Sequence, residues 1–275
     1  QNYIVDHYPK MTKDEKRKLK ESTFKGWELV QATARLCAMN LMLHGIGGDK
    51  TVPIVVSDAL AGDPGERFEI VLTNPPFGKK SSTMIVGEDG KVSTEKDLVE
   101  RDDFWATTSN KQLNFLQHVK TLLKITGRAA IVVPDNVLFE GGAGETVRRK
   151  LLHECDVHTL LRLPTGLFYA QGVKANVLFF DKQQASETPW TKKLWIYDLR
   201  TNKHFTLKTD PLKREDLDEF VKCYNPENRY QREPTWSETN PDGRWRAYDY
   251  EELINRDKAS LDIFWLRDES LEDSD

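Results

Sequence analysis

The 275-residue sequence has few cysteines, no long apolar run and no metal-binding motif. Its cysteines, Cys37, Cys155 and Cys223, are too widely spaced for a CxxC motif and favour a reducing compartment such as the cytoplasm. The longest apolar stretches, residues 129–134 and 177–180, are too short to span a bilayer, which excludes a membrane-spanning protein. No metal site is predicted, because the histidines show no metal-ligand spacing with cysteines or carboxylates. This holds for His44, His118, His153, His158 and His204.

An excess of basic residues is also absent. The sequence carries 40 Lys and Arg against 44 Asp and Glu, so its formal net charge is −4. A protein that binds nucleic acid by itself usually has a basic excess, so this balance argues against a stand-alone nucleic-acid binder. A chain whose phosphate contacts are supplied by a partner subunit needs no such excess. The composition also argues against disorder of the whole chain, since 7 Trp, 8 Tyr and 12 Phe are present.

Short, unbroken apolar runs alternate with helical patterns along most of the chain. Such runs favour buried parallel strands, so the pattern predicts an α/β fold with helices on both faces of a parallel sheet. Composition shifts near Lys182, which predicts a catalytic domain over residues 1–183 and a C-terminal extension over 184–275 packed on the sheet. Strands are expected at 23–29, 53–56, 68–72, 128–133, 157–163, 176–180 and 194–199, and helices at 31–44, 110–123, 145–153 and 214–223.

The sharpest local signal is Asn74-Pro75-Pro76-Phe77, which directly follows the predicted strand 68–72. Open α/β sheets bind ligands at the carboxyl ends of their strands. Two consecutive prolines stiffen the turn and have no N–H to pair, so carbonyl oxygens are left to face a cleft. An amide, rigid carbonyls and an aromatic ring suit a flat base with an exocyclic amine. The alternative is a plain strand-terminating turn, because Asn-Pro and Pro-Pro are common there.

An adenine amine is a poor nucleophile, because its lone pair is delocalised into the ring. Acceptors at the Asn74 side chain and the Pro75 carbonyl would favour sp³ character at that nitrogen as a transition state forms. The lone pair then becomes available to attack an electrophilic methyl group, while Phe77 stacks on the base. No proton has to leave first, so the chemistry needs no strong base.

Two acidic residues stand at the ends of earlier predicted strands, Glu28 at the end of the first and Asp58 at the end of the second. One carboxylate at such an edge can hold ribose hydroxyls and another can accept from an adenine amine. Acidic residues at strand ends are more often simply solvated, so neither residue carries this reading without the Asn74–Phe77 turn.

Together these residues resemble the motifs of amino-group DNA methyltransferases, and more closely those of the modification subunit of type I restriction-modification systems. The similarity extends over nearly the whole chain. It is carried by FKGWELVQATARLCAMNLMLHGI (24–46), LTNPPFG (72–78), GRAAIVVPDNVLFEGG (127–142), LPTGLFYAQGVKANVLFFDK (163–182) and RDKASLDIFWL (256–266).

The resemblance implies a Rossmann-like S-adenosylmethionine-dependent methyltransferase that makes N6-methyladenine in DNA. Glu28 would hold the cofactor ribose, Asp58 with the following Ala59 would hold its adenine, and Asn74 would lie beside both cofactor and target. Asn74, Pro75, Pro76 and Phe77 would handle an adenine flipped out of the duplex. Implied partners are DNA, a specificity subunit and a restriction subunit, and residues 134–144 would form a loop near the target.

The sequence departs from this family in one respect, because no Asp-Pro-x-x-Gly-x-Gly motif precedes Glu28. We therefore expect the first strand of the family's sheet to be missing, so that these residues are an internal portion of a longer polypeptide. The loss would leave two unpaired strand edges. A chain without that strand is expected to bind the cofactor weakly and to be inactive alone.

Two other functions remain open. A methyltransferase of the same fold could act on a protein glutamine or an RNA base; such relatives share Asn-Pro-Pro-aromatic, often with Tyr last. Phe77 and the similarity over 256–266 favour DNA adenine. A catalytically silent assembly module is the second alternative, which the missing glycine-rich motif supports.

Overall fold

The computed structural model describes residues 1–48, 51–77, 82–86, 92–96, 98–168 and 173–269. Gly78 and residues 169–172 of the segments that carry the resemblance lie outside the described residues. The chain forms two compact units, an N-terminal unit of residues 1–64 and a C-terminal unit of residues 65–275. The predicted domain boundary at residue 183 stays a prediction, and residues 184–275 belong to the same compact unit as the main sheet.

The N-terminal unit contains a strand–helix–strand arrangement that matches the predicted elements. Strands β1 (Gly26–Glu28) and β2 (Ile54–Val56) pair in parallel, with Glu28 opposite Val56, and helix α3 (Gln31–Leu43) connects them. Gly45 follows α3 with a φ of 71°, a left-handed conformation in which glycine carries no Cβ penalty. Helices α1 (Asn2–His7) and α2 (Lys13–Glu21) precede this arrangement.

The C-terminal unit is built on a six-stranded sheet in the order β10-β9-β7-β8-β6-β3. The prediction of a parallel sheet is wrong in part: β3, β6, β7 and β9 run parallel, whereas β8 and β10 are antiparallel to their neighbours. The described residues between β7 and β8 contain no helix, and the two strands pair antiparallel. The strands are β3 (Phe68–Thr73), β6 (Leu123–Pro134), β7 (Cys155–Arg162), β8 (Ala175–Lys182), β9 (Lys193–Asp198) and β10 (Trp245–Asp249).

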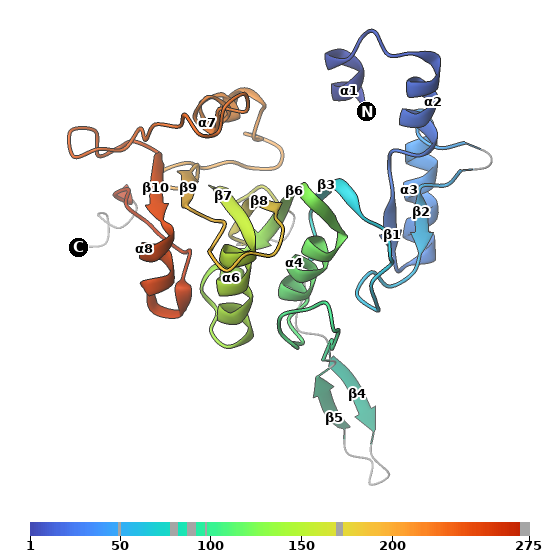
Figure 1. Ribbon diagram of the computed structural model, residues 1–275, viewed down its shortest axis with the longest axis horizontal. Helices are drawn as coiled ribbons and strands as arrows, with labels where there is room; N and C mark the ends of the chain where they lie inside the picture. Colours follow the sequence, from blue (N-terminus) through green and yellow to red (C-terminus); the bar gives the residue numbers. More distant parts are fainter. Residues whose placement is uncertain (49–50, 78–81, 87–91, 97, 169–172, 270–275) are drawn as a thin grey trace. The chain divides into compact units, whose positions relative to one another are not determined.

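Alternating side chains of this sheet enter two separate cores, one on each face. Leu160 of β7 packs with one core and Leu161 with the other. The first core is covered by α4 (Lys111–Leu122), α6 (Ala143–Glu154) and α8 (Tyr250–Asn255), which lie along the same face (Figure 1). The second is covered by α7 (Asp218–Tyr224) and the preceding 3₁₀ turn η1 (Glu215–Leu217). Helices on both faces are confirmed.

Residues 184–275 do more than pack on the sheet, because they supply its strands β9 and β10.

Further short elements are a hairpin of β4 (Ser82–Val86) and β5 (Val92–Lys96), the helix α5 (Asp135–Phe139) and a 3₁₀ turn η2 (Asp257–Ala259). Within the described ranges, β1 pairs with β2 alone and β3 with β6 alone. No helix in those ranges is long and apolar enough to cross a membrane.

Candidate active site

The Asn74–Phe77 turn follows the last residue of β3, at the carboxyl edge of the main sheet. Strands β3 and β6 are parallel and in register from Ile70 opposite Arg128 to Thr73 opposite Ile131. The loops that follow β6, β7 and β9 therefore leave the sheet at the same edge as Asn74. This is the edge at which α/β sheets bind their ligands.

The turn presents polar acceptors next to an aromatic ring. The Asn74 side chain is exposed, Pro75 is buried, and neither the Asn74 amide nor the Pro75 carbonyl makes a hydrogen bond to another described residue. Phe77 is half-buried, and its ring centroid lies 5.2 Å from that of Phe168 in an edge-to-face arrangement. Burial of Pro75 and packing of Phe77 anchor the turn, while the Asn74 side chain stays exposed.

Helix α4 supports the turn from below and connects it to the loop after β6. The Gln112 Nε2 amide donates to the Pro76 carbonyl over 3.4 Å. Asn110 caps α4, because its Oδ1 accepts from the backbone N–H groups of Gln112 and Leu113, and its Nδ2 donates to Glu140 at 2.7 Å. Through these contacts, the turn after β3 and the loop after β6 share one support.

A buried ionic network lies at the same edge. The Arg200 guanidinium donates to both carboxylate oxygens of Asp135 at 2.7 and 2.9 Å, and Asn176 donates to the same group at 2.8 Å. Burial alone would raise the pKa of Asp135, but the hydrogen bonds from Arg200 and Asn176 and the nearby positive charges lower it. Asp135 is the first residue of α5, so this network fixes the start of the loop after β6.

The C-terminal segment returns to this edge as well. Arg162, the last residue of β7, is fully buried and donates to the Asp262 carboxylate at 2.6 Å. The Phe264 ring lies against the same guanidinium, with its centroid 3.9 Å from Cζ. Residues 256–266 carry part of the family resemblance, and here they close the carboxyl end of β7.

The two predicted cofactor acids lie together in the N-terminal unit. Glu28 ends β1 and Asp58 follows β2, so both stand at the carboxyl ends of paired parallel strands. Glu28 Oε1 accepts from the Val30 backbone N–H at 2.8 Å, and Asp58 Oδ1 accepts from the Leu60 N–H at 2.9 Å. The second oxygen of each carboxylate has no hydrogen bond within the described part of the chain, and Ala59 is half-buried beside them.

The predicted residues thus fall into two groups. Glu28, Asp58 and Ala59 belong to the N-terminal unit, and Asn74–Phe77 belongs to the C-terminal unit. Sequence reasoning missed Phe168, Gln112 and Arg200. Phe168 had a usable signal, because it stands in the loop after a predicted parallel strand, whereas nothing in the spacing pointed to the other two.

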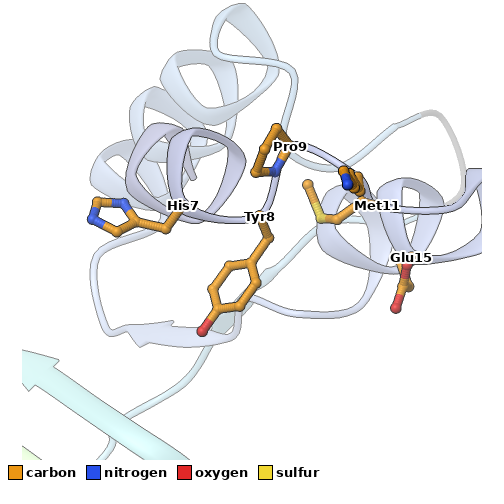
Figure 2. A pocket seen from close by; sticks show the side chains of 6 residues that line it. His7, Tyr8, Pro9, Met11 and Glu15 are labelled. Atoms are coloured by element: carbon orange, nitrogen blue, oxygen red, sulfur yellow. The ribbon is translucent and has the colours of Figure 1, made fainter.

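A further hollow in the N-terminal unit lacks the features of an active site. It lies at the turn between α1 and α2, and Figure 2 shows the His7 ring and the Glu15 side chain on its opposite sides. Glu15 already caps α2 through Thr12, and the His7 ring stacks on Tyr3 at 3.8 Å. In the described ranges, no group of three or more His, Cys, Asp or Glu residues is arranged to hold a metal ion.

The chain is similar to methylase subunits of type I restriction enzymes. It is 40% identical over 282 residues to the EcoKI methylase subunit of Escherichia coli K12, covering 92% of this chain and 50% of that protein. The StySJI methylase subunit of Salmonella typhimurium is also 40% identical over 282 residues, with the same coverage. The chain therefore spans about half the length of the curated relatives it matches.

Solved structures agree with this similarity. The crystal structure of the EcoKI M protein matches with a TM-score of 0.78 and 37% identity, covering 97% of this chain and 58% of that one. A modification subunit of a putative type I restriction enzyme from Vibrio vulnificus matches with a TM-score of 0.62 and 27% identity, covering 91% of this chain and 51% of that one. The N-6 DNA Methylase family model matches residues 4–260. The chain belongs to the N-6 DNA methylase family.

Proposed function

We propose that this chain forms the catalytic part of a type I modification subunit, which transfers a methyl group from S-adenosylmethionine to adenine N6 in DNA. The observation that carries the proposal is the pair of unpartnered acceptors, the Asn74 amide oxygen and the Pro75 carbonyl, beside Phe77 at the carboxyl edge of the sheet. They stand in a chain that matches the N-6 DNA Methylase family over residues 4–260.

The residues present fit the cofactor. Glu28 and Asp58 each keep one carboxylate oxygen without a hydrogen bond in the described part of the chain, so one can accept from the ribose hydroxyls and the other from the adenine amine. Ala59 offers a small apolar contact beside Asp58. Bound S-adenosylmethionine would supply the electrophilic methyl group.

The target base would be held by the turn after β3. A flipped adenine would place its N6 amine against the Asn74 oxygen and the Pro75 carbonyl, which accept its two protons. Both hydrogen bonds strengthen as N6 becomes sp³ and gains positive charge, so they stabilise the transition state more than the ground state. Phe77 would stack on the base, and Phe168, which packs edge to face against Phe77, would hold that ring in place.

DNA binding and assembly are part of the same proposal. The formal net charge of −4 gives this chain little attraction for phosphates, so a specificity subunit would supply most contacts to DNA. A restriction subunit would complete the system, and the complex would act in the cytoplasm. One structural relative is described as showing complex assembly of a type I restriction-modification system.

The test uses the full natural chain with its specificity partner, labelled S-adenosylmethionine and DNA that carries the recognition sequence. Asn74→Ala should lower DNA methylation by about 100-fold or more, because it removes an acceptor that acts in the transition state. Asn255→Ala is the matched control, since Asn255 is exposed at the end of α8. Both variants should unfold at the wild-type temperature.

Three outcomes would contradict the proposal. Label that enters protein or RNA but never DNA would indicate a same-fold methyltransferase with another substrate. Absence of S-adenosylmethionine binding by the full natural chain in calorimetry would favour a silent assembly module. Equal activity of the Asn74 and Asn255 variants would remove Asn74 from the mechanism.

A further inference from the structure

A cavity of about 480 Å³ lies at the amino edge of the main sheet, opposite the edge that carries Asn74. Its lining includes Asp156 and His158 from the start of β7, and Lys192 and Trp195 from the beginning of β9. Strand β7 runs parallel to β3 through β8 and β6, so the start of β7 and the end of β3 are at opposite edges. This cavity is therefore separate from the proposed methyl-transfer site.

Two guanidinium groups in its wall, one buried and one half-buried, each have one nitrogen without a partner among the described residues. Arg232 is only 6% exposed, and it donates to the carbonyls of Tyr224 and His158 at 2.7 and 3.2 Å, yet its Nη2 has no partner among the described residues. Arg229 donates to Asp181, and its Nη1 is likewise buried and unpartnered in the described ranges. Both side chains line the cavity, so its wall carries two guanidinium groups.

The charges around the cavity leave a small positive excess. Asp181 is paired with Arg229, and Lys193 lies 3.6 Å from Asp249. Lys192 and Arg232 then remain against one carboxylate, that of Asp156. His158 adds no charge at neutral pH, because burial lowers its pKa to about 4 despite its contact with Asp181. A ligand that fits must be anionic. It must also bring a hydrogen-bond donor for the carboxylate of Asp156, which makes no hydrogen bond to any described residue.

Aromatic side chains provide the remaining part of the lining. Trp190 and Trp195 are half-buried, and Trp195 stacks on Trp245 with a centroid distance of 5.3 Å and an interplanar angle of 17°. Tyr230 lines the cavity with 91% of its surface exposed, next to the half-buried Arg229. Indole and phenol faces beside cations are the surfaces on which nucleobases stack.

We propose that this cavity is a second ligand site that takes a nucleotide. The phosphate would lie on Lys192 and the two arginines, the base against the tryptophans, and a sugar hydroxyl or exocyclic amine would donate to Asp156. A free nucleotide and the phosphorylated end of a nucleic-acid strand share this chemistry. The site does not depend on the proposed methyl transfer.

The experiment is calorimetric titration of the full natural chain with AMP, inorganic phosphate, adenosine and a short 5′-phosphorylated oligonucleotide. AMP should bind about tenfold more tightly than phosphate or adenosine, because both halves of the site contribute. Lys192→Glu and Tyr230→Ala, both at exposed positions, should each lower the affinity for AMP by about tenfold or more. Lys203→Glu is the matched charge control, since Lys203 is exposed beyond the other end of β9.

The outcomes separate the possibilities. The site is supported if AMP binding survives Asn74→Ala and is weakened by Lys192→Glu. DNA methylation should be unchanged in the Lys192 variant. Binding of the phosphorylated oligonucleotide alone, with the same sensitivity to Lys192→Glu, supports it with a strand end as the source. The proposal is overturned if none of the probes binds, if phosphate binds as tightly as AMP, if Asn74→Ala abolishes binding, or if Lys203→Glu weakens it as much as Lys192→Glu.

Discussion

Replacing Arg148 with Met should destabilise the C-terminal unit by about 3 kcal/mol. Arg148 is a residue of α6 with 1% exposure, and all its hydrogen bonds go to backbone carbonyls. It donates to Val137 at 2.9 Å, to Glu140 and Lys258 at 2.7 Å, and to Ala259 at 3.2 Å. One side chain thus joins the loop after β6 to the C-terminal segment, and Met fills most of its volume without any donor.

The magnitude follows from two opposing contributions. Four charge-assisted hydrogen bonds at about 1.5 kcal/mol each contribute about 6 kcal/mol. Burial opposes this, because it lowers the pKa of Arg148 from 12.5 to about 10. At about 1.4 kcal/mol per pH unit, keeping the charge buried costs about 3.5 kcal/mol. The difference is about 2.5 kcal/mol, so the expected loss is roughly 3 kcal/mol.

The assay is equilibrium urea unfolding of the full natural chain, followed by circular dichroism. Arg149→Met is the matched control, because Arg149 is the next residue of α6 and its side chain is 43% exposed. It makes an i,i+4 ion pair with Glu145 and donates to the Ile254 carbonyl at 2.9 Å, and these exposed contacts together should contribute about 1 kcal/mol, well below the loss expected for Arg148. Equal losses of stability in the two variants would refute the idea that Arg148 joins the two segments.

Three shorter predictions follow from other groups. Asp135→Asn should destabilise the C-terminal unit at pH 7, and this loss of stability should vanish in acid. The pKa of Asp135 is lower in the folded than in the unfolded state, so its charged form stabilises the fold above the unfolded-state pKa. That stabilisation is lost as the pH falls through the folded-state pKa. Asp156→Asn should stabilise the protein by about 1 kcal/mol at pH 8 and by nothing at pH 3, because burial raises the pKa of Asp156 to about 6; thermal unfolding across pH measures both effects. Phe168→Ala should lower kcat for DNA methylation and leave S-adenosylmethionine binding unchanged in calorimetry, since Phe168 packs against Phe77 of the turn that would hold the target base.

Much of the local structure could be predicted because its signals are local. The helix expected over residues 31–44 is α3 with Gly45 after it, and Asn110 caps α4 at the predicted start. The strand expected over 68–72 is β3, which ends where the Asn-Pro-Pro turn begins. Apolar period, caps and breakers are read from neighbouring residues, so a sequence shows them directly.

The direction of the strands and the ionic network could not be predicted in this way. An unbroken apolar run is buried on both faces, but it does not say which neighbour it pairs with, so β8 was expected to be parallel. Arg200 and Asp135 are 65 residues apart, and no periodicity connects them. Strand β10 was missed because the run Trp245–Asp249 alternates with charged residues and stands in a region rich in turns.

Contacts of the C-terminal segment explain why the resemblance includes residues 256–266 as well as the Asn-Pro-Pro-Phe turn. Arg162 ends β7 at the carboxyl edge and is fully buried, so it needs a carboxylate there, and Asp262 supplies it. The same guanidinium lies 3.9 Å from Asp135, whose other partner, Arg200, follows β9. Removing one member would leave a buried charge uncompensated, which is strongly destabilising. The edge that presents Asn74 is thus held by side chains at or after the ends of β6, β7 and β9 and by the C-terminal segment. Removing any one of these side chains would destabilise the others.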